Sequence, residues 1–216
     1  MLKLHKGAVE SAIHAFRDHK ARLSKGFFMD VLDWKRPNTN TYWIRMVFDH
    51  ERSDTHAVYI TGDLGEAIIY PTCPATLFNM AQSFTFINKD GSIDINEHYF
   101  LGKVKTANHL YDWSMEDFQE DLREAHVERY GKDEDQSDLE NFFEEHCSSY
   151  LSDVTIDNSM GVQIDSAAKD DLHLLFPDYE EWISGCGQRV SNFVAFWLVA
   201  MRMAYEQTKE MEDGEK

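Results

Sequence analysis

The sequence predicts an α+β protein in which a small antiparallel β-meander, at about residues 27–70, packs against a predominantly helical C-terminal part. Two observations predict this fold. Before residue 71, short segments rich in β-branched and aromatic residues alternate with polar turn residues, which is typical of strands and hairpins. After residue 71, apolar residues recur at helical spacing almost to the end of the chain, which indicates helices.

The length and composition favour one domain. The chain has 216 residues, of which 43% are hydrophobic and 13% aromatic, so it can bury a substantial core. We expect a single domain at residues 1–208, with a sheet-containing part at about 1–107 and an acidic helical part at about 108–208. Charged residues dominate residues 209–216, where we expect a disordered tail.

The N-terminal half contains the expected strands. Apolar residues at near-helical spacing predict an opening helix at about residues 9–23. A first strand is expected at about 27–34, and the three most clearly marked strands are residues 42–48, 56–61 and 66–70.

The last two of these strands are joined by a turn with two glycines. Because glycine adopts positive φ at little steric cost, Gly62 and Gly65 suit a tight reversal between strands. We therefore expect the motif to be architectural. The turn explains the two glycines but does not explain the carboxylates of Asp63 and Glu66.

The C-terminal part is predicted to be helical. A helix is expected at about residues 75–81, preceded by a proline that suits the first turn. Capping patterns predict further helix N-termini at residues 94–97, 114–117 and 137–140. A broad apolar face at about residues 189–207 predicts the helix that closes the core.

The formal net charge of −18 restricts the partners of the protein. It argues against a direct nucleic-acid-binding or anionic-membrane surface, because both require clustered Lys and Arg. A partner with a basic surface fits better, although solubility alone would also explain the charge. The N-terminus lacks the apolar core of a secretory signal, and the longest apolar run, residues 193–201, is too short for a membrane span. We therefore expect a cytoplasmic protein.

The sequence contains no familiar catalytic or metal-binding motif. Cys73, Cys147 and Cys186 form no C-x-x-C pair, and the histidines show no H-E-x-x-H or H-x-H spacing. Cys186 lies between two glycines in an exposed-looking setting, but a turn around a buried small residue explains it better than a reactive thiolate does. We therefore expect no cofactor, no metal and no enzymatic activity.

Acidic residues concentrate at residues 112–146, which contain 14 Asp and Glu against three Lys and Arg, a net charge of −11. In the helix expected after residue 114, six carboxylates lie outside a narrow apolar stripe: Glu116, Asp117, Glu120, Asp121, Glu124 and Glu128. They place about one charge per 3 to 3.6 Å of helix axis, close to the phosphate spacing of about 3.4 Å along one DNA strand. This pattern suits mimicry of a phosphate backbone, and it also suits an ordinary solvated helix face.

Residues 86–97 partly match the calcium loop of an EF-hand. Six residues match positions of that pattern: Asn88, Asp90, Gly91, Ile93, Asp94 and Glu97. Phe86, however, replaces the first carboxylate ligand. A turn that leads into a helix explains these residues without a metal, so calcium binding by residues 88–97 is the weaker interpretation.

Four short motifs follow one another along the chain: V-L-D-W-K-R-P at 31–37, Y-W-I-R at 42–45, T-G-D-L-G-E-A at 61–67 and Y-F-L-G-K at 99–103. In this combination the chain resembles a family of small proteins encoded in bacteriophages and prophages of Gram-positive bacteria. G-D-L-G-E-A after a strand is the most specific element of the resemblance. The chain departs from the family in I-I-Y at 68–70 and in its acidic insertion near 131–140. The resemblance implies a phage origin and, because the family has no established activity, no catalytic residues.

Three functions compete on these grounds. The first is an inhibitor of a host defence or nucleic-acid-binding complex, such as a CRISPR effector, in the manner of an anti-CRISPR protein or DNA mimic. Its partner would be a host protein with a basic surface, bound by the six carboxylates at residues 116–128. The second is a phage accessory interaction or structural module whose acidic face is merely solvated. The third is an enzyme that uses Asp63 and Glu66.

Overall fold

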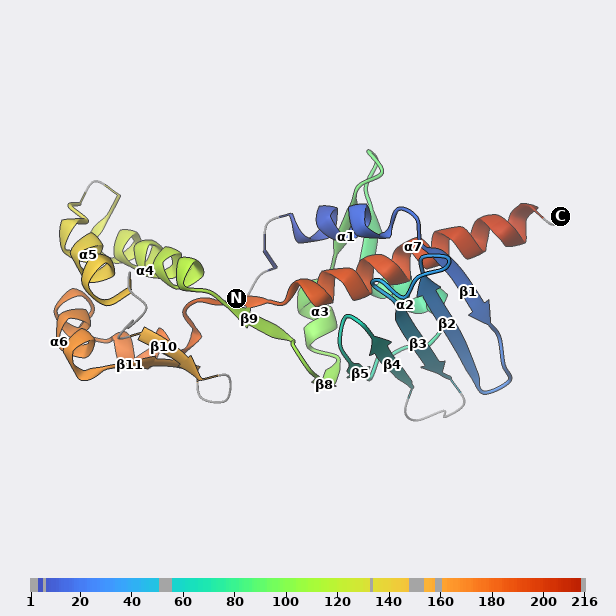
Figure 1. Ribbon diagram of the computed structural model, residues 1–216, viewed down its shortest axis with the longest axis horizontal. Helices are drawn as coiled ribbons and strands as arrows, with labels where there is room; N and C mark the ends of the chain where they lie inside the picture. The colour runs from blue at the N-terminus through green and yellow to red at the C-terminus, as the bar shows by residue number, and fades with distance from the viewer. Residues whose placement is uncertain are drawn as a thin grey trace. The chain divides into compact units, whose positions relative to one another are not determined.

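The computed structural model describes Leu4, His5 and residues 7–50, 56–132, 134–147, 154–157 and 161–214 (Figure 1). These residues form a six-stranded antiparallel sheet from the N-terminal half of the chain, three short strand pairs and seven α-helices. The predicted α+β class is confirmed.

The chain divides into two compact units. The sheet unit comprises Met1–Leu110 and Val190–Lys216, and the inserted unit comprises Tyr111–Arg189. We expected the last helix to belong to the acidic helical part, whereas α7 (Asn192–Gly214) belongs to the sheet unit and continues into the segment for which we expected disorder.

The sheet has the strand order β1-β2-β3-β4-β5-β8. Its first five strands follow one another along the chain, so the expected meander is present, with one additional strand at each edge. The strands are β1 (Lys20–Ser24), β2 (Met29–Lys35), β3 (Ile44–Asp49), β4 (Ala57–Gly62), β5 (Ala67–Ile69) and β8 (Val104–Ala107).

The opening helix is shorter than predicted. Helix α1 spans Ala8–Phe16, and Leu23, which we placed in that helix, lies in β1 opposite Leu32 of β2. The side chains of β1 alternate between exposed and half-buried, which is the period of a strand. Pairing of the whole of β1 with β2 therefore prevails over the helical spacing of the apolar residues.

The core of the sheet unit lies between one sheet face and the helices. Leu32 and Trp34 of β2, with Ile44, Met46 and Phe48 of β3, occupy alternate positions and are at most 1% exposed. They belong to one cluster with residues of α1, α2 (Leu77–Phe84) and α7, among them Phe16, Met80, Val194, Trp197 and Met201. The last helix therefore closes this core, as its apolar face predicts.

A small hairpin of β6 (Thr85–Ile87) and β7 (Ile93–Ile95) precedes α3 (Glu97–Leu101). The capping box predicted at residues 94–97 is wrong, because Asp94 lies in β7 opposite Phe86. Asn96 caps α3 instead, and its side chain accepts a hydrogen bond from the amide of Tyr99 at 3.2 Å.

The inserted unit has a core of its own, formed by one cluster that includes Phe118, Leu122, Phe142 and Leu172. Its longest helix is α4, and a π-helical segment, η1, follows α5. In chain order its elements are β9 (Tyr111–Trp113), α4 (Met115–Tyr130), α5 (Ser137–Phe142), η1 (Phe143–Cys147), β10 (Val154–Asp157), β11 (Gly161–Ile164), α6 (Ser166–Leu175), η2 (Tyr179–Glu181), η3 (Ile183–Gly185) and β12 (Gln188–Val190), which pairs with β9.

The two helix starts expected in this unit differ in outcome. Ser114 caps α4 as predicted, because its Oγ accepts the amide of Asp117 at 3.0 Å and donates to the Asp117 carboxylate at 2.7 Å. Helix α5 begins at Ser137, but Gln136 occupies the N-cap position and makes no side-chain cap hydrogen bond. Asp135 instead accepts the amide of Ser137 at 2.9 Å.

None of the helices in the described part of the chain combines the length and the apolar character that crossing a membrane requires.

Candidate functional site

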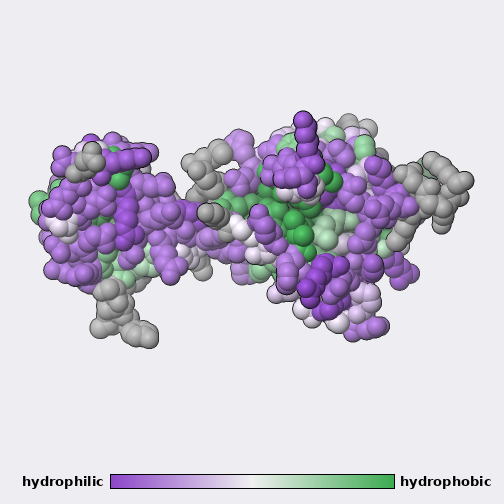
Figure 2. Space-filling model, turned by 90° about the horizontal axis from the view of Figure 1, so that it is seen from above, coloured by the Kyte–Doolittle hydropathy of each residue, from purple (hydrophilic) through white to green (hydrophobic). Residues whose placement is uncertain are grey.

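The charge of the protein is divided very unequally between the two units. The inserted unit contains 22 Asp and Glu against five Lys and Arg, a formal net charge of −17, whereas the sheet unit contains 17 against 16, a net charge of −1. In the face shown in Figure 2, hydrophilic residues cover most of the inserted unit. Any long-range attraction of a cationic partner therefore originates in the inserted unit.

Helix α4 carries the residues that we predicted to bind a partner. Phe118, Leu122 and His126 are buried on one side of the helix. On the opposite side four exposed glutamates form a row at intervals of four residues: Glu116, Glu120, Glu124 and Glu128. Neighbouring members of this glutamate row are one helical turn apart, so their repulsion costs about 0.2 to 0.5 kcal/mol per pair.

The two aspartates of the predicted surface, Asp117 and Asp121, do not belong to the glutamate row but contact Arg189. Asp121 forms a bidentate ion pair with Arg189, with Nη2–Oδ1 and Nη1–Oδ2 distances of 2.8 and 3.0 Å. Asp117 lies 3.3 Å from Nε of the same arginine, and Asp121 also accepts the amide of Gly187 at 2.7 Å. The three charged side chains are only 13 to 22% exposed. Asp117 and Asp121 therefore hold α4 to the end of the inserted unit instead of facing a partner.

This ion-pair cluster also affects the protonation of Arg189. Hydrogen bonds to Asp121 raise the pKa of Arg189 above its usual value, with a further contribution from the charge of Asp117. The arginine thus remains charged and offsets the two carboxylates that it contacts. Of the six predicted partner-binding residues, the structure leaves the four of the glutamate row facing solvent.

The spacing of the row alters the comparison with nucleic acid. Residues four apart in an α-helix are separated by about 6 Å along the axis, whereas phosphates of one DNA strand follow at about 3.4 Å. The exposed carboxylates of α4 therefore do not match the phosphates of a DNA strand one for one. The row is a sparser line of negative charge on a unit that is acidic throughout.

The G-D-L-G-E-A motif forms the turn between β4 and β5. Gly62 and Gly65 both have positive φ, of 139° and 87°. A Cβ at Gly62 would lie 2.2 Å from the carbonyl oxygen of Trp43, and one at Gly65 would lie 2.7 Å from Asn108 Oδ1. Both glycines are therefore required by backbone conformation and by close packing.

The two carboxylates of this motif are exposed. Asp63 accepts the amide of Trp43 at 3.3 Å and donates its own amide to the Trp43 carbonyl at 2.9 Å. The amide of Glu66 donates to Asn108 Oδ1. The motif is thus bonded to the neighbouring β3 strand start and to the segment after β8, which is the behaviour of a structural turn.

The segment that resembles a calcium loop forms the β6–β7 hairpin. The side-chain Nδ2 of Asn88 donates to Ser92 Oγ and to Asp94 Oδ2, both at 2.9 Å. Glu97, which would supply the last calcium ligand, accepts the amide of Leu4 at 3.0 Å. Hydrogen bonds from Ser92 lower the pKa of Asp90. These residues are therefore engaged in the turn and in a contact with the N-terminal segment.

The sequence suggests an exposed setting for Cys186, and this expectation is wrong, because the residue is only 8% exposed. Burial raises the pKa of its thiol to about 12, and the nearby charge of Asp121 acts in the same direction. A protonated, buried thiol is a poor nucleophile. The structure therefore supports the interpretation of residues 185–187 as a packed turn.

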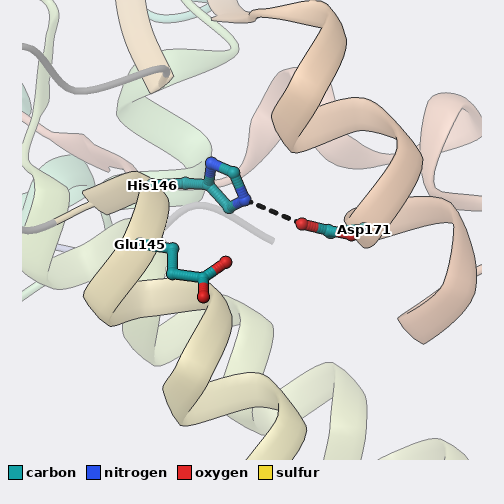
Figure 3. Close-up of side chains that lie close together, drawn as sticks. All are labelled: Glu145, His146 and Asp171. Carbon is teal, nitrogen blue, oxygen red and sulfur yellow. Dashed lines mark hydrogen bonds and ion pairs between the residues drawn. The ribbon is translucent and has the colours of Figure 1, made fainter.

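One group of side chains that the sequence did not reveal lies in the inserted unit. Glu145 and His146 of η1 approach Asp171 of α6, and one ligand atom from each lies within 4.8 Å of the others (Figure 3). His146 Nε2 is 3.0 Å from Asp171 Oδ2. The only sequence signal is an adjacent Glu and His, and the third member follows 25 residues later on another helix. No motif of fixed spacing could have identified this group.

No protein family, curated protein or solved structure matches the chain. The fold and the charge distribution define the class as an α+β protein with a strongly acidic unit inserted before its last helix.

Proposed function

We propose that the protein is a phage-encoded acidic binding protein that inhibits a host defence or nucleic-acid-binding complex, in the manner of an anti-CRISPR protein, in the cytoplasm of the host cell. The observation that carries this proposal is the net charge of −17 on the 79 residues of the inserted unit, next to a nearly neutral sheet unit. The phage origin rests on the resemblance described above.

The physical basis is competition for a basic surface. A groove that binds nucleic acid presents clustered Lys and Arg, and its affinity depends on neutralising phosphates. A folded unit with a large negative charge is steered toward such a groove and can occupy it without being a substrate. The glutamate row lies on α4, and the Asp117–Arg189–Asp121 cluster holds the adjacent flank of this helix.

The test compares two variants in which four exposed carboxylates are reversed. The first changes the glutamate row, Glu116, Glu120, Glu124 and Glu128, to lysine. The matched control changes four exposed carboxylates elsewhere in the inserted unit, Glu134, Asp170, Glu180 and Glu181, to lysine. Both alter the net charge equally, so a difference between them reports the position of the charges and not their sum.

Each protein is immobilised and incubated with a lysate of a Gram-positive bacterium at low and at high salt, and the bound proteins are identified. We expect the wild type to retain a nucleic-acid-binding complex at low salt, and we expect the glutamate-row variant to bind it at least about tenfold more weakly, because four attractive contacts become repulsive. The purified complex should also lose binding to its own nucleic acid when the protein is added.

Equal retention of the complex by the wild type and the glutamate-row variant would show that α4 is merely solvated. The protein would then be better described as an accessory module. If both four-charge variants lose binding equally, total charge is responsible and the row has no special part in recognition.

A further inference from the structure

We propose that Glu145, His146 and Asp171 bind a divalent transition-metal ion of the Zn²⁺ type in the inserted unit. The proposal does not rest on the proposed function, because it concerns different residues and a different chemistry. It rests on the distances among the three side chains, on the burial of the histidine and on the ligand chemistry that they offer together.

The distances suit one shared ion. Zn²⁺ lies about 2.0 to 2.2 Å from nitrogen and oxygen ligands, so two ligands at a tetrahedral or right angle are about 2.8 to 3.6 Å apart. His146 Nε2 and Asp171 Oδ2 are 3.0 Å apart, within this range. The third ligand atom, from Glu145, lies within 4.8 Å of both, and an exposed glutamate can close that interval by side-chain rotation.

The local fold positions the histidine firmly. His146 is 6% exposed and its ring lies 5.1 Å from the ring of Phe142. It belongs to the π-helical segment η1, a rare conformation that occurs frequently at functional sites. Because a π-helix has more residues per turn than an α-helix, consecutive side chains diverge less, which favours the approach of Glu145 to the same point.

The carboxylates keep the site accessible from solvent. The side chain of Asp171 is 49% exposed, and Glu145 is exposed as well. In Figure 3 the Glu145 carboxylate lies beside the line that joins His146 to Asp171. An ion can therefore enter without unfolding of the helices, and three protein ligands leave at least one coordination position for water.

The chemistry of the three ligands selects among metals. Imidazole suits Zn²⁺ and its neighbours in the transition series, whereas Ca²⁺ and Mg²⁺ prefer sites built entirely of oxygen ligands. The net charge of −17 on the inserted unit raises the local concentration of any cation, so affinity alone does not establish the site. Selectivity for a transition ion over Mg²⁺ and dependence on these three residues are the decisive properties.

The first experiment is a calorimetric titration of the full-length protein with Zn²⁺ in a large excess of Mg²⁺, which occupies the diffuse acidic surface. We expect one Zn²⁺ per chain. Glu145→Gln and Asp171→Asn should each weaken binding at least about tenfold, the lower bound for disturbing a metal site. Asp170→Asn is the matched control, because it removes the same charge from the neighbouring position of α6 and should leave the affinity unchanged.

His146 is buried, so His146→Gln could lose Zn²⁺ binding simply by misfolding. Thermal unfolding with and without Zn²⁺ distinguishes these two causes. Zn²⁺ should raise the thermal unfolding midpoint of the wild type and of Asp170→Asn, since a ligand bound to the folded state stabilises it. The two exposed carboxylate variants should fold normally and lose this shift, and His146→Gln should lose it as well. The proposal fails if Mg²⁺ abolishes Zn²⁺ binding, or if Asp170→Asn weakens it as much as Asp171→Asn. In either case, the His146–Asp171 contact is only a hydrogen bond between η1 and α6.

Discussion

Arg202 of α7 illustrates at the scale of one residue how the sheet unit satisfies its buried backbone. The side chain is 4% exposed, and its guanidinium donates to the carbonyls of Ala81 and Thr85 and to the Thr85 hydroxyl, all at 2.8 Å. These acceptors lie where α2 ends and β6 begins, and the Ala81 carbonyl also accepts the amide and the hydroxyl of Thr85. One buried arginine thus joins α7 to this junction through three hydrogen bonds.

Arg202→Met should lower the free energy of unfolding of the sheet unit by about 3 kcal/mol, because buried carbonyls lose their charged donor. Urea denaturation combined with amide exchange of residues 192–207 measures this loss. Arg45→Met is the control, since the Arg45 side chain is 46% exposed and its pair with Asp33 should contribute less than about 1 kcal/mol. Similar losses in both variants would contradict a special role for Arg202.

Cys186 connects burial to pH dependence. Its pKa of about 12 lies above the usual value of 9.0, so the folded state holds the thiol proton more tightly than the unfolded state does. The resulting stabilisation is complete below about pH 9 and is lost as the pH rises toward 12, because the unfolded thiol ionises first.

We expect the free energy of unfolding to fall between about pH 8 and about pH 10, and the fall to be smaller in Cys186→Ala. Urea denaturation at the two pH values measures the difference.

In the folded wild type at about pH 8, a thiol reagent should modify the half-buried Cys73 before Cys186. Faster modification of Cys186 would show that the thiol is neither buried nor protonated.

At the scale of elements, α4 has two charged flanks with different roles. Its glutamate row is open to solvent, while Asp117 and Asp121 are bonded to Arg189 from the end of the inserted unit. The contact between Asp121 and Arg189 spans 68 residues of sequence, so it secures the helix to the segment through which the chain leaves the unit.

Arg189→Gln should destabilise α4 by about 2 kcal/mol, a value between those of exposed and buried ion pairs, because two partly buried carboxylates then face each other without a cation. Amide hydrogen exchange of residues 115–130 should accelerate accordingly. Arg123→Gln is the matched control, since the Arg123–Glu140 pair is about half exposed. No difference in exchange between the two variants would show that the cluster does not secure the helix.

At the scale of the whole molecule, the inserted unit begins and ends at neighbouring points of the sheet unit. The amide of Ser191 donates to the carbonyl of Leu110 at 3.0 Å, and the core cluster that contains Trp197 is built from residues of the sheet unit alone. The sheet and its helices therefore require no side chain of the inserted unit to complete that core.

Replacing residues 111–189 by a short Gly-Ser linker should leave a folded sheet unit with a cooperative unfolding transition. Its net charge should fall from −18 to −1, and binding to basic partners should disappear with it. Circular dichroism and thermal denaturation test the fold, and retention on an anion-exchange resin, which the acidic full-length protein should bind and the shortened protein should not, tests the charge. A shortened chain that fails to fold would show that the two units depend on each other.

The features that could be predicted from the sequence are those set by neighbouring residues. The Ser114 cap, the glycine turn at 62–65 and the apolar face of α7 are local patterns, and each is found in the structure. The strand β1 escaped prediction because its pairing with β2 decides its conformation. The ion pair of Asp121 with Arg189 and the contact of His146 with Asp171 join distant segments, and composition cannot reveal which carboxylates take part in such contacts.

The adjacency of Leu110 and Ser191 has a mechanical consequence. When the two chain termini are pulled apart, tension passes through the sheet unit, which holds both ends of the inserted unit together. The inserted unit carries no load until Leu110 and Ser191 separate, whatever its own stability. In a single-molecule stretching experiment the inserted unit should therefore extend last, because the sheet unit, into whose sequence it is inserted, must unfold first.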